Sequence, residues 1–246
     1  MRPVTGGVLE PLRVIYEDDH LIGINKRCGD LVEGDTSGDE PLVTAVERYL
    51  NDRTPPPPGG VFAGVIHRLD RPTSGCVVYA KTPAAQRQMN ALFRPVATAA
   101  GRGVTKTYWA VVDNEPPREA GELEHFIYHD RELNKSYTFE EPREKAKRAR
   151  LAYRLLGRSE RYAFLEIDLI TGRHHQIRAQ LAAVGCHIKG DLKYGARRSN
   201  PEGGIHLHAR AMSFLHPIRQ HPVMMVAEPP DETLWNLVVE IAQERR

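Results

Sequence analysis

The sequence predicts an α+β fold built on a mixed, mostly antiparallel sheet. Strand-like segments dominate the middle of the 246-residue chain, and helix-like segments do not alternate strictly with them, as they would in a doubly wound fold. No repeat and no change of composition marks off an appended domain. A chain of this length can bury a sizeable core, so we expect one domain over residues 12–246, preceded by a short extension, residues 1–11.

The first third of the chain predicts two strands, a helix and an extended loop. Residues 14–26 (VIYEDDHLIGINK) have the pattern of two short strands around an Asp-Asp turn. From Leu42 onwards, apolar residues recur at helical spacing. The segment TPPPPGG (54–60) suits neither a helix nor a central strand, so we expect an extended loop there.

The middle of the chain predicts a buried strand at residues 76–80 (CVVYA), followed by a helix. Thr82 is placed to cap this helix and Pro83 to occupy its first position. The apolar residues expected on its inner face are Met89, Leu92 and Phe93.

The remaining elements follow from alternation and helical spacing. Strands are predicted at 105–113, 161–170, 205–214 and 222–227, and in the second of these we expect Ala163, Leu165 and Ile167 to share one face. A helix is predicted after residue 173, with an apolar face of Ile177, Leu181 and Val184 and a C-cap at Gly185. We expect Asp231 to cap a last helix, whose apolar positions are Leu234, Leu237, Val238 and Ile241.

The composition excludes some classes of protein. Lys and Arg total 34 against 32 Asp and Glu, so any basic surface must come from local segregation of charge. Three distant cysteines, Cys28, Cys76 and Cys186, favour a reducing, cytoplasmic setting in which each is a small apolar residue. The N-terminus has no apolar signal segment, and no apolar run is long enough to span a membrane.

The segment GVIHRLDRPTSG (64–75) places a lone carboxylate, Asp70, between Arg68 and Arg71. It follows an apolar, strand-like run, and Gly75 indicates a turn with unusual backbone angles. An ionised carboxylate in a pocket can attack carbon or accept a proton; the alternative is a solvated turn aspartate. Glycoside hydrolysis normally needs two carboxylates, and no second acid lies at an obvious local spacing.

A second dense stretch, residues 171–195, clusters Arg173, His174, His175 and Arg178 at a helix start. Cations there oppose the helix dipole, which favours binding of an anion or pairing with a carboxylate over a merely solvated basic helix end. The two histidines are adjacent, so we expect them to point in different directions. They do not have the i, i+4 spacing of a zinc-binding helix.

Three further features each allow two interpretations. Tyr108 is either a core residue or a ring that stacks on a nucleobase. His206 and His208 lie on one face of a strand and are either structural or metal ligands, and with Asp191 they would suit a metal-dependent hydrolase. The basic run at residues 143–150, together with residues 195–200, is either a solvated loop or a surface that contacts phosphates.

Taken in order, the motifs HRLDRPTSG, KTYWAVV, TGRHHQIR, GDLKYG and HLHA resemble those of the RluA-type pseudouridine synthases. The resemblance covers about residues 12–228. It implies a pseudouridine synthase fold, with the sheet in two halves and an active-site cleft between them. It also implies isomerisation of uridine to pseudouridine in rRNA or tRNA, with no cofactor and no metal. RNA would be the partner of a monomer without membrane contact; an RNA-binding relative that has lost catalysis is the alternative.

The resemblance assigns roles to individual residues. Asp70 would be the essential carboxylate, Tyr108 would stack on the target uracil, and Arg178 would pair with Asp70 across the cleft. Arg68 would enter the space left by the flipped nucleotide. The other residues expected to contact RNA or the base are His67, Arg71, Thr73, Arg173, His175 and Gln176.

The chain departs from the family pattern at three places. Arg27 stands where relatives have proline, Ala179-Gln180 replaces a common Val-His, and His187 occupies another usual proline position. These departures bear on loop geometry and choice of substrate, because none of them alters Asp70, Tyr108 or Arg178.

Overall fold

The computed structural model describes residues 11–52, 60–94 and 103–244, and within them the strands form one sheet. The order of the sheet is β1 (Val14–Glu17), β2 (Leu21–Lys26), β4 (Ser74–Ala80), β10 (Leu207–Leu215), β5 (Thr105–Val112), β9 (Ala163–Leu169), β8 (Lys147–Arg158), β6 (Ala120–Asp130) and β7 (Lys135–Phe139). Two further strands pair outside this path, β3 (Gly64–Val65) with β4 and β11 (Pro222–Val226) with β10. In the described part of the chain only the pairing of β10 with β4 is parallel, which confirms the mixed, mostly antiparallel sheet.

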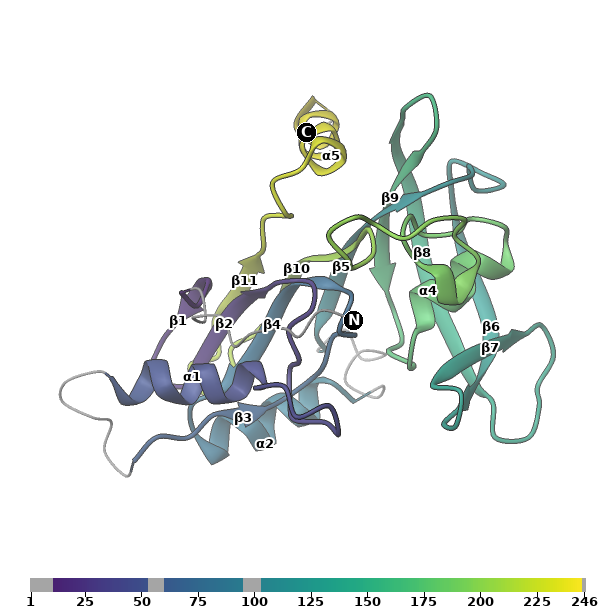
Figure 1. The fold of residues 1–246 in the computed structure, drawn as a ribbon. Coiled ribbons are helices and arrows are strands. Elements are labelled where there is room, and N and C mark those ends of the chain that lie inside the picture. The colour runs from purple at the N-terminus through teal and green to yellow at the C-terminus, as the bar shows by residue number, and fades with distance from the viewer. Residues whose placement is uncertain (1–10, 53–59, 95–102, 245–246) are drawn as a thin grey trace.

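The sheet has two halves, as Figure 1 shows. One half contains β1 to β4 and β11, and the other contains β6 to β9. The strands β10 and β5 join them in the middle, antiparallel to each other. Residues near this junction can therefore come from both halves, which positions the site described below.

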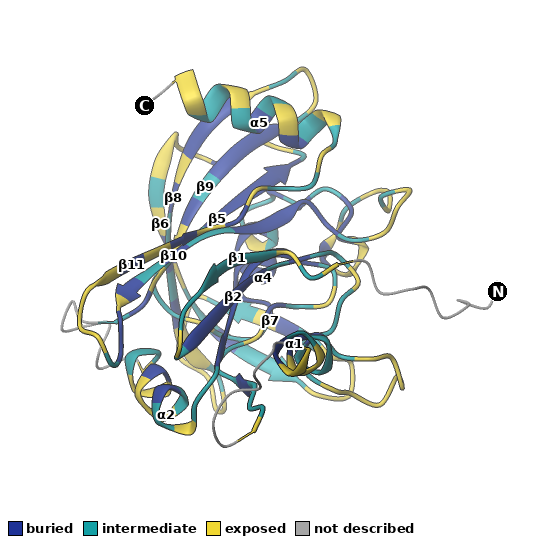
Figure 2. Cartoon of the chain, turned by 90° about the vertical axis from the view of Figure 1, so that its left-hand side faces the viewer, coloured by how far each residue is buried: buried dark blue, intermediate teal, exposed yellow. Residues whose placement is uncertain are grey.

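Helices cover both faces of the sheet. On one face, α1 (Leu42–Asn51) and α4 (Gln176–Ala183) contribute to a single core cluster with Val77, Leu165 and Ile167. On the other face, α2 (Pro83–Leu92) packs on Cys76 and Val78, while α5 (Thr233–Glu244) packs Trp235 and Val238 on Phe164. Figure 2 shows the strands between these helices as the most buried part of the chain. The alternation predicted for residues 161–170 is thus confirmed.

Most predicted elements are present at the expected places, and the cap of α2 is confirmed in detail. The Ala85 N–H donates to Thr82 Oγ1 over 3.2 Å, and Pro83 is the first helical residue. The cap predicted for the last helix is wrong. That helix begins at Thr233, and the Asp231 carboxylate accepts a hydrogen bond from the Asn236 side chain instead (2.9 Å).

The basic run at residues 143–150 is only partly a loop, because β8 begins at Lys147. In the strand, Arg148 Nε lies 2.7 Å from Glu124 Oε1, and Arg150 Nη2 lies 2.7 Å from Glu122 Oε2. These two arginines are therefore neutralised by acidic residues of the adjacent β6. The loop predicted at 54–60 falls almost wholly outside the described residues, as do residues 1–10 of the proposed extension.

Gly75 explains how the two halves of the sheet meet. Its φ of +114° is in the region that favours glycine, and a Cβ there would lie 2.3 Å from the Ala209 carbonyl oxygen. Gly75 and Ala209 are partners in the parallel pairing of β4 with β10. A side chain at this position would push the two strands apart. The unusual backbone angle predicted for Gly75 is confirmed, but the residue lies in strand β4 and not in a turn.

Candidate active site

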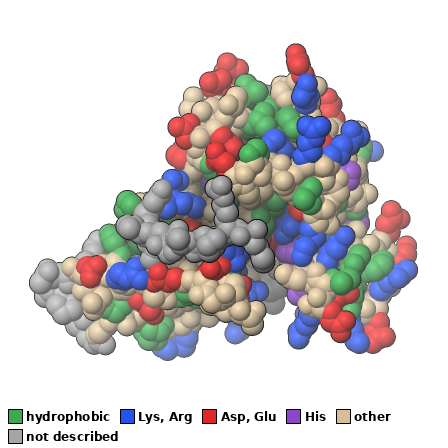
Figure 3. All heavy atoms as spheres, in the orientation of Figure 1, with side chains coloured by type: hydrophobic (Ala, Val, Ile, Leu, Met, Phe, Trp, Pro, Cys, Tyr) green, Lys and Arg blue, Asp and Glu red, His purple; other side chains and the backbone are tan. Residues whose placement is uncertain are grey.

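A cavity of about 400 Å³ opens at the junction of the two halves. Its lining comes from the loop before β4, the first part of β5, and the segment from the end of β9 to α4: His67–Asp70, Thr73, Lys106, Tyr108 and Leu169–Arg178. Figure 3 shows Lys, Arg and His side chains gathered on the side of the cleft that belongs to the β6–β9 half. A second groove of about 770 Å³ shares Gly172, Arg173 and His174 with this cavity.

The loop that carries Asp70 is anchored by a buried lysine that sequence reasoning missed. Lys26, which is 1% exposed, donates through Nζ to the carbonyls of Arg27, Arg71 and Thr73 over 2.8–3.1 Å. Burial lowers the pKa of Lys26 to about 8. The Thr73 N–H also donates to the Asp70 carbonyl. These bonds fix the backbone on either side of the carboxylate.

Among the described residues, hydrogen bonds and ion pairs reach only one oxygen of the Asp70 carboxylate. Oδ2 accepts a hydrogen bond from Arg178 Nη1 over 2.9 Å, and His175 Nε2 lies 3.4 Å from the same oxygen. No hydrogen bond from the described residues reaches Oδ1. The side chain is 26% exposed and lines the cavity. Oδ1 is therefore the oxygen available to a bound molecule.

Arg178 is itself held by a buried carboxylate. Its Nε and Nη2 donate to Asp191 Oδ2 and Oδ1 over 2.6 and 2.8 Å, a bidentate pair whose members are 5% and 1% exposed. Burial alone would lower the pKa of Arg178, but the bonds to Asp191 and the charge of Asp70 raise it above its ordinary value. The contact predicted between Arg178 and Asp70 is present. Asp191 was missed as its partner, although it lies in the quoted motif GDLKYG.

Tyr108 lies on β5, lines the cavity and is 7% exposed. The ring belongs to the core cluster and also forms part of the cavity wall. Its stacking on a nucleobase stays a prediction. Burial, and then the charge of Asp70, raise the pKa of Tyr108 well above its ordinary value. The phenol is therefore protonated at neutral pH.

The two arginines that flank Asp70 in sequence lie in different places. Arg68 lines the cavity, is 65% exposed and pairs with Glu33 over 2.5 Å. Arg71 is not among the residues that line the cavity. It donates to the Gly29 carbonyl over 3.0 Å and pairs with Asp39. The structure thus brings Arg68 but not Arg71 to the site.

Several other predicted contact residues have polar atoms already bonded within the protein. His67 Nε2 accepts the Val78 N–H over 3.1 Å, and burial lowers the pKa of His67 to about 3. Gln176 accepts from Thr171 Oγ1 and the Arg173 N–H and donates to the Arg150 carbonyl. Both residues line the cavity, so their direct effect in this arrangement is to shape its wall. Thr73 is 2% exposed, and its Oγ1 has no hydrogen-bond partner among the described residues.

The expectation that His174 and His175 point in different directions is wrong. Their ring centroids are 3.7 Å apart, and the ring of His129 on β6 stacks on the other side of His174 at 3.6 Å. His175 has a φ of +50° at the N-cap of α4, and this left-handed turn places its side chain beside that of its neighbour. Burial lowers the pKa of His174 to about 4 and that of His175 to about 2, with further lowering from neighbouring positive charges.

The described residues hold no group of three or more His, Cys, Asp or Glu side chains that could bind a metal ion. His208 is buried, with Nδ1 2.9 Å from Ser74 Oγ and Nε2 2.9 Å from the Ala227 carbonyl. Asp191 is engaged by Arg178. All three cysteines are unpaired, and no helix in the described ranges is both long and apolar enough to cross a membrane.

Comparison with known proteins identifies the family to which the chain belongs. The sequence profile of the family described as RNA pseudouridylate synthase matches residues 20–183. The ribosomal large subunit pseudouridine synthase D of Xylella fastidiosa is 35% identical over 236 residues, covering 90% of this chain and 67% of that protein. The tRNA pseudouridine synthase C of Vibrio vulnificus is 29% identical and is covered over 94% of its length, against 93% of this chain.

Solved structures show the same fold. Human RNA pseudouridylate synthase domain containing 4 superposes with a TM-score of 0.71 at 23% identity, covering 94% of this chain and 93% of that one. Human RNA pseudouridylate synthase domain containing 1 superposes with a TM-score of 0.68 at 21% identity. The profile covers most of the chain, so the family follows from sequence and the fold from structure. The chain belongs to the RNA pseudouridylate synthase family, as an RluA-type isomerase.

Proposed function

We propose that this enzyme isomerises uridines of rRNA or tRNA with Asp70 as its reacting carboxylate. The observation that carries the proposal is the Asp70 carboxylate, held through Oδ2 by buried Arg178 at the wall of a 400 Å³ cavity. A cavity of this size suits a nucleoside taken out of its stack. Asp70, Arg178 and Tyr108 are all present at this cavity, which supports catalysis over the alternative of an inactive RNA-binding relative.

The reaction explains the single acid. The N1–C1′ bond breaks, the uracil turns, a C5–C1′ bond forms, and N1 gains a proton while C5 loses one. Free Oδ1 of Asp70 is placed either to attack C1′ or to remove the 2′ proton and give a glycal. Water is neither consumed nor released in this isomerisation, so the reaction does not need a second carboxylate to activate water.

The remaining residues of the cavity bind and orient the nucleotide in this proposal. Tyr108 stacks on the flipped uracil, and in a further hypothesis its phenol assists removal of the C5 proton. Arg68 exchanges its partner Glu33 for the RNA and fills the gap left by the base; the exposure of this pair supports such an exchange. His67, Thr73, Arg173, His175 and Gln176 form the wall, while Arg71 supports the loop after β2.

The choice of RNA is the finer part of the proposal. Relatives are named for the large ribosomal subunit and for tRNA, and recognition of RNA depends on its shape and on looped-out bases. We further propose that residues 12–246 act as one domain, as a monomer, in the cytoplasm.

Pseudouridine mapping of total RNA from a strain that lacks this protein tests the proposal. We expect specific pseudouridines to disappear from rRNA or tRNA and to return when the gene is restored. An unchanged map, together with no tritium release from uracil-C5-labelled total RNA by the purified protein, would contradict an active synthase.

A further inference from the structure

A chain of polar groups leads from β7 to the Asp70 carboxylate. The backbone N–H of Ser136 donates to Tyr194 Oη over 2.7 Å. Tyr194 Oη lies 3.0 Å from His175 Nδ1, and His175 Nε2 lies 3.4 Å from Asp70 Oδ2. Tyr194 and His175 are 7% and 8% exposed, so water does not compete freely for these groups.

The positions of the protons in this chain follow from which groups can donate. A backbone N–H can only donate, so Tyr194 Oη accepts from Ser136, and its own proton is then free to be donated to His175 Nδ1, 3.0 Å away. His175 is neutral, because burial and the charge of Arg178 disfavour its protonated form. A neutral imidazole that accepts at Nδ1 carries its proton on Nε2. The opposite tautomer would direct a lone pair at the Asp70 carboxylate.

We propose that Tyr194 fixes His175 as the Nε2–H tautomer, and that His175 thereby acts as a positioning residue for Asp70. The inference rests on the proposed function of Asp70 and adds two residues to it. Arg178 donates a hydrogen bond to Oδ2, and His175 places its Nε2–H 3.4 Å from the same oxygen, which leaves Oδ1 facing the bound nucleotide. His175 stays neutral there, so it positions the carboxylate without competing with it for a proton.

Other charged or titratable groups surround His175. Those that face it are Asp70 from the loop before β4, His129 from β6, His174 and Arg178 on either side of the helix start, and Lys193 from the turn that also holds Tyr194. Burial first, and then these neighbouring positive charges, lower the pKa of His175, which explains why it does not gain a second proton beside a carboxylate. The guanidinium of Arg178 also lies over the Tyr194 ring at 5.0 Å.

Ser136 sets the opposite tautomer on the neighbouring histidine. Its hydroxyl donates to the His174 carbonyl over 2.7 Å, so at 2.9 Å it accepts from His174 Nδ1. His174 is then the Nδ1–H form, while His175 is the Nε2–H form. Because Tyr194 is held by the backbone of residue 136, removing the Ser136 hydroxyl affects only His174. This difference provides a matched control.

Two-bond ¹H–¹⁵N correlation spectra of the histidine-labelled full chain test the tautomers without RNA. We expect His175 to be protonated only at Nε2 from pH 5 to 8, and Tyr194→Phe to give a mixture of tautomers or the Nδ1–H form. Ser136→Ala should change His174 and leave His175 as it was. A wild-type His175 that is Nδ1–H or doubly protonated, or one that is unaffected by Tyr194→Phe, would overturn the inference.

Steady-state isomerisation then tests the role. We expect His175→Ala to lower kcat about tenfold with little change in KM, because the Nε2–H beside Asp70 Oδ2 is lost. Tyr194→Phe, which loses the hydroxyl that contacts His175 Nδ1 and the Ser136 N–H, should lower kcat about fivefold. His175→Gln, which keeps an N–H donor near the Nε2 position, should restore most of kcat. Equal kcat in wild type and His175→Ala would overturn the role, as would Gln and Ala variants that are equally slow. An inactive wild type with the expected tautomers would contradict the proposed function instead.

Discussion

At the residue scale, the geometry of Asp70 depends on a carboxylate that never faces the cavity. Asp191 holds two of the donor groups of Arg178, and the third contact goes to Asp70. The contact between Arg178 and Asp70 could be predicted because both belong to motifs of a known family. The roles of Asp191 and Tyr194 as partners of Arg178 and His175 could not be predicted, because the motif that contains them does not indicate which buried side chain each one contacts.

Replacing Asp191 with Asn should destabilise the protein strongly. The change leaves the buried guanidinium of Arg178 without its bidentate partner, which costs about 3–5 kcal/mol of unfolding free energy. Asp70→Asn is the matched control, and because Asp70 is 26% exposed we expect a loss below about 1 kcal/mol. Urea denaturation of the three proteins measures this, and equal stabilities for the two variants would contradict the structural role of Asp191.

At the element scale, alternation predicted the strands of the first half of the sheet and its centre, together with β9, whereas β6, β7 and β8 were not predicted. The errors lie where tertiary contacts decide. The sequence pattern could not show that residues 147–150 form the start of β8. There, acidic residues of β6 neutralise the charges of Arg148 and Arg150. The pattern also could not show the left-handed backbone of His175, which stacks the two histidines.

The close approach of β4 to β10 makes Gly75 irreplaceable. In Gly75→Ala the alanine is strained by the positive φ, and its Cβ would lie 2.3 Å from the Ala209 carbonyl oxygen. We therefore expect the free energy of unfolding to fall by well above about 2 kcal/mol. Gly185 is the control, because its φ is +77° and a Cβ there meets nothing within 4 Å. Gly185→Ala should therefore lose only about 1 kcal/mol. Equal losses in thermal or urea unfolding would show that the approach of the strands is not what requires glycine.

At the scale of the whole molecule, buried neutral histidines should make stability fall in acid. Burial lowers the pKa of His67 to about 3 and that of His208 to about 4, below the ordinary value of 6.5. The unfolded chain therefore binds protons first as pH falls. The contribution of each histidine to stability is complete well above about pH 6.5 and decreases toward about pH 4 by up to about 1.4 kcal/mol per pH unit.

Urea denaturation at intervals between pH 7.5 and 4.5 measures this slope. His208→Asn, which removes one titrating group, should show a smaller slope even where it is less stable overall. A slope unchanged by this substitution would contradict the contribution of His208.

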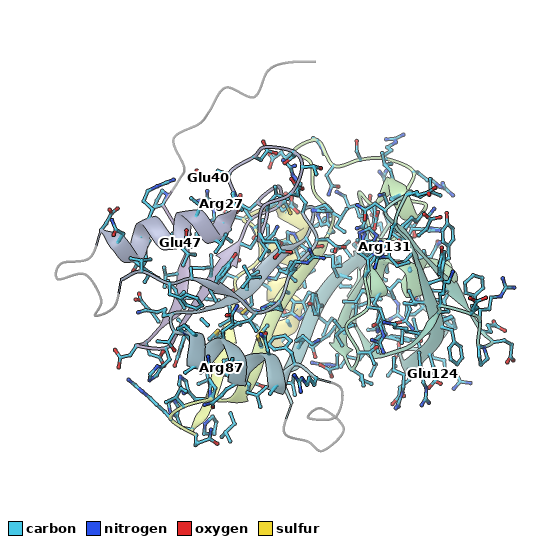
Figure 4. The ribbon with its side chains drawn as sticks, turned by 90° about the horizontal axis from the view of Figure 1, so that it is seen from below. Arg27, Glu40, Glu47, Arg87, Glu124 and Arg131 are labelled. Atoms are coloured by element: carbon cyan, nitrogen blue, oxygen red, sulfur yellow. The ribbon has the colours of Figure 1, made fainter. Side chains whose placement is uncertain are left out.

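The distribution of charge also gives a prediction for RNA binding. Arg131 lines the groove beside the cavity in the β6–β9 half, whereas Arg87 lies on α2 in the other half, as Figure 4 shows. We expect Arg131→Ala to weaken RNA affinity and to reduce the slope of log affinity against log salt by about one, as loss of a phosphate contact does. Arg87→Ala should change neither quantity. Binding assays across salt concentrations decide this, and equal slopes for both variants would exclude a phosphate contact at Arg131.

The most direct test of the account is single-turnover isomerisation by Asp70→Asn, with RNA affinity measured on the same preparation. The substitution keeps the shape of the side chain and removes the charge that Arg178 holds in place. We expect RNA binding close to that of the wild type and no measurable release of tritium from uracil C5. Isomerisation at the wild-type rate would contradict the central claim that the carboxylate of Asp70 carries the reaction.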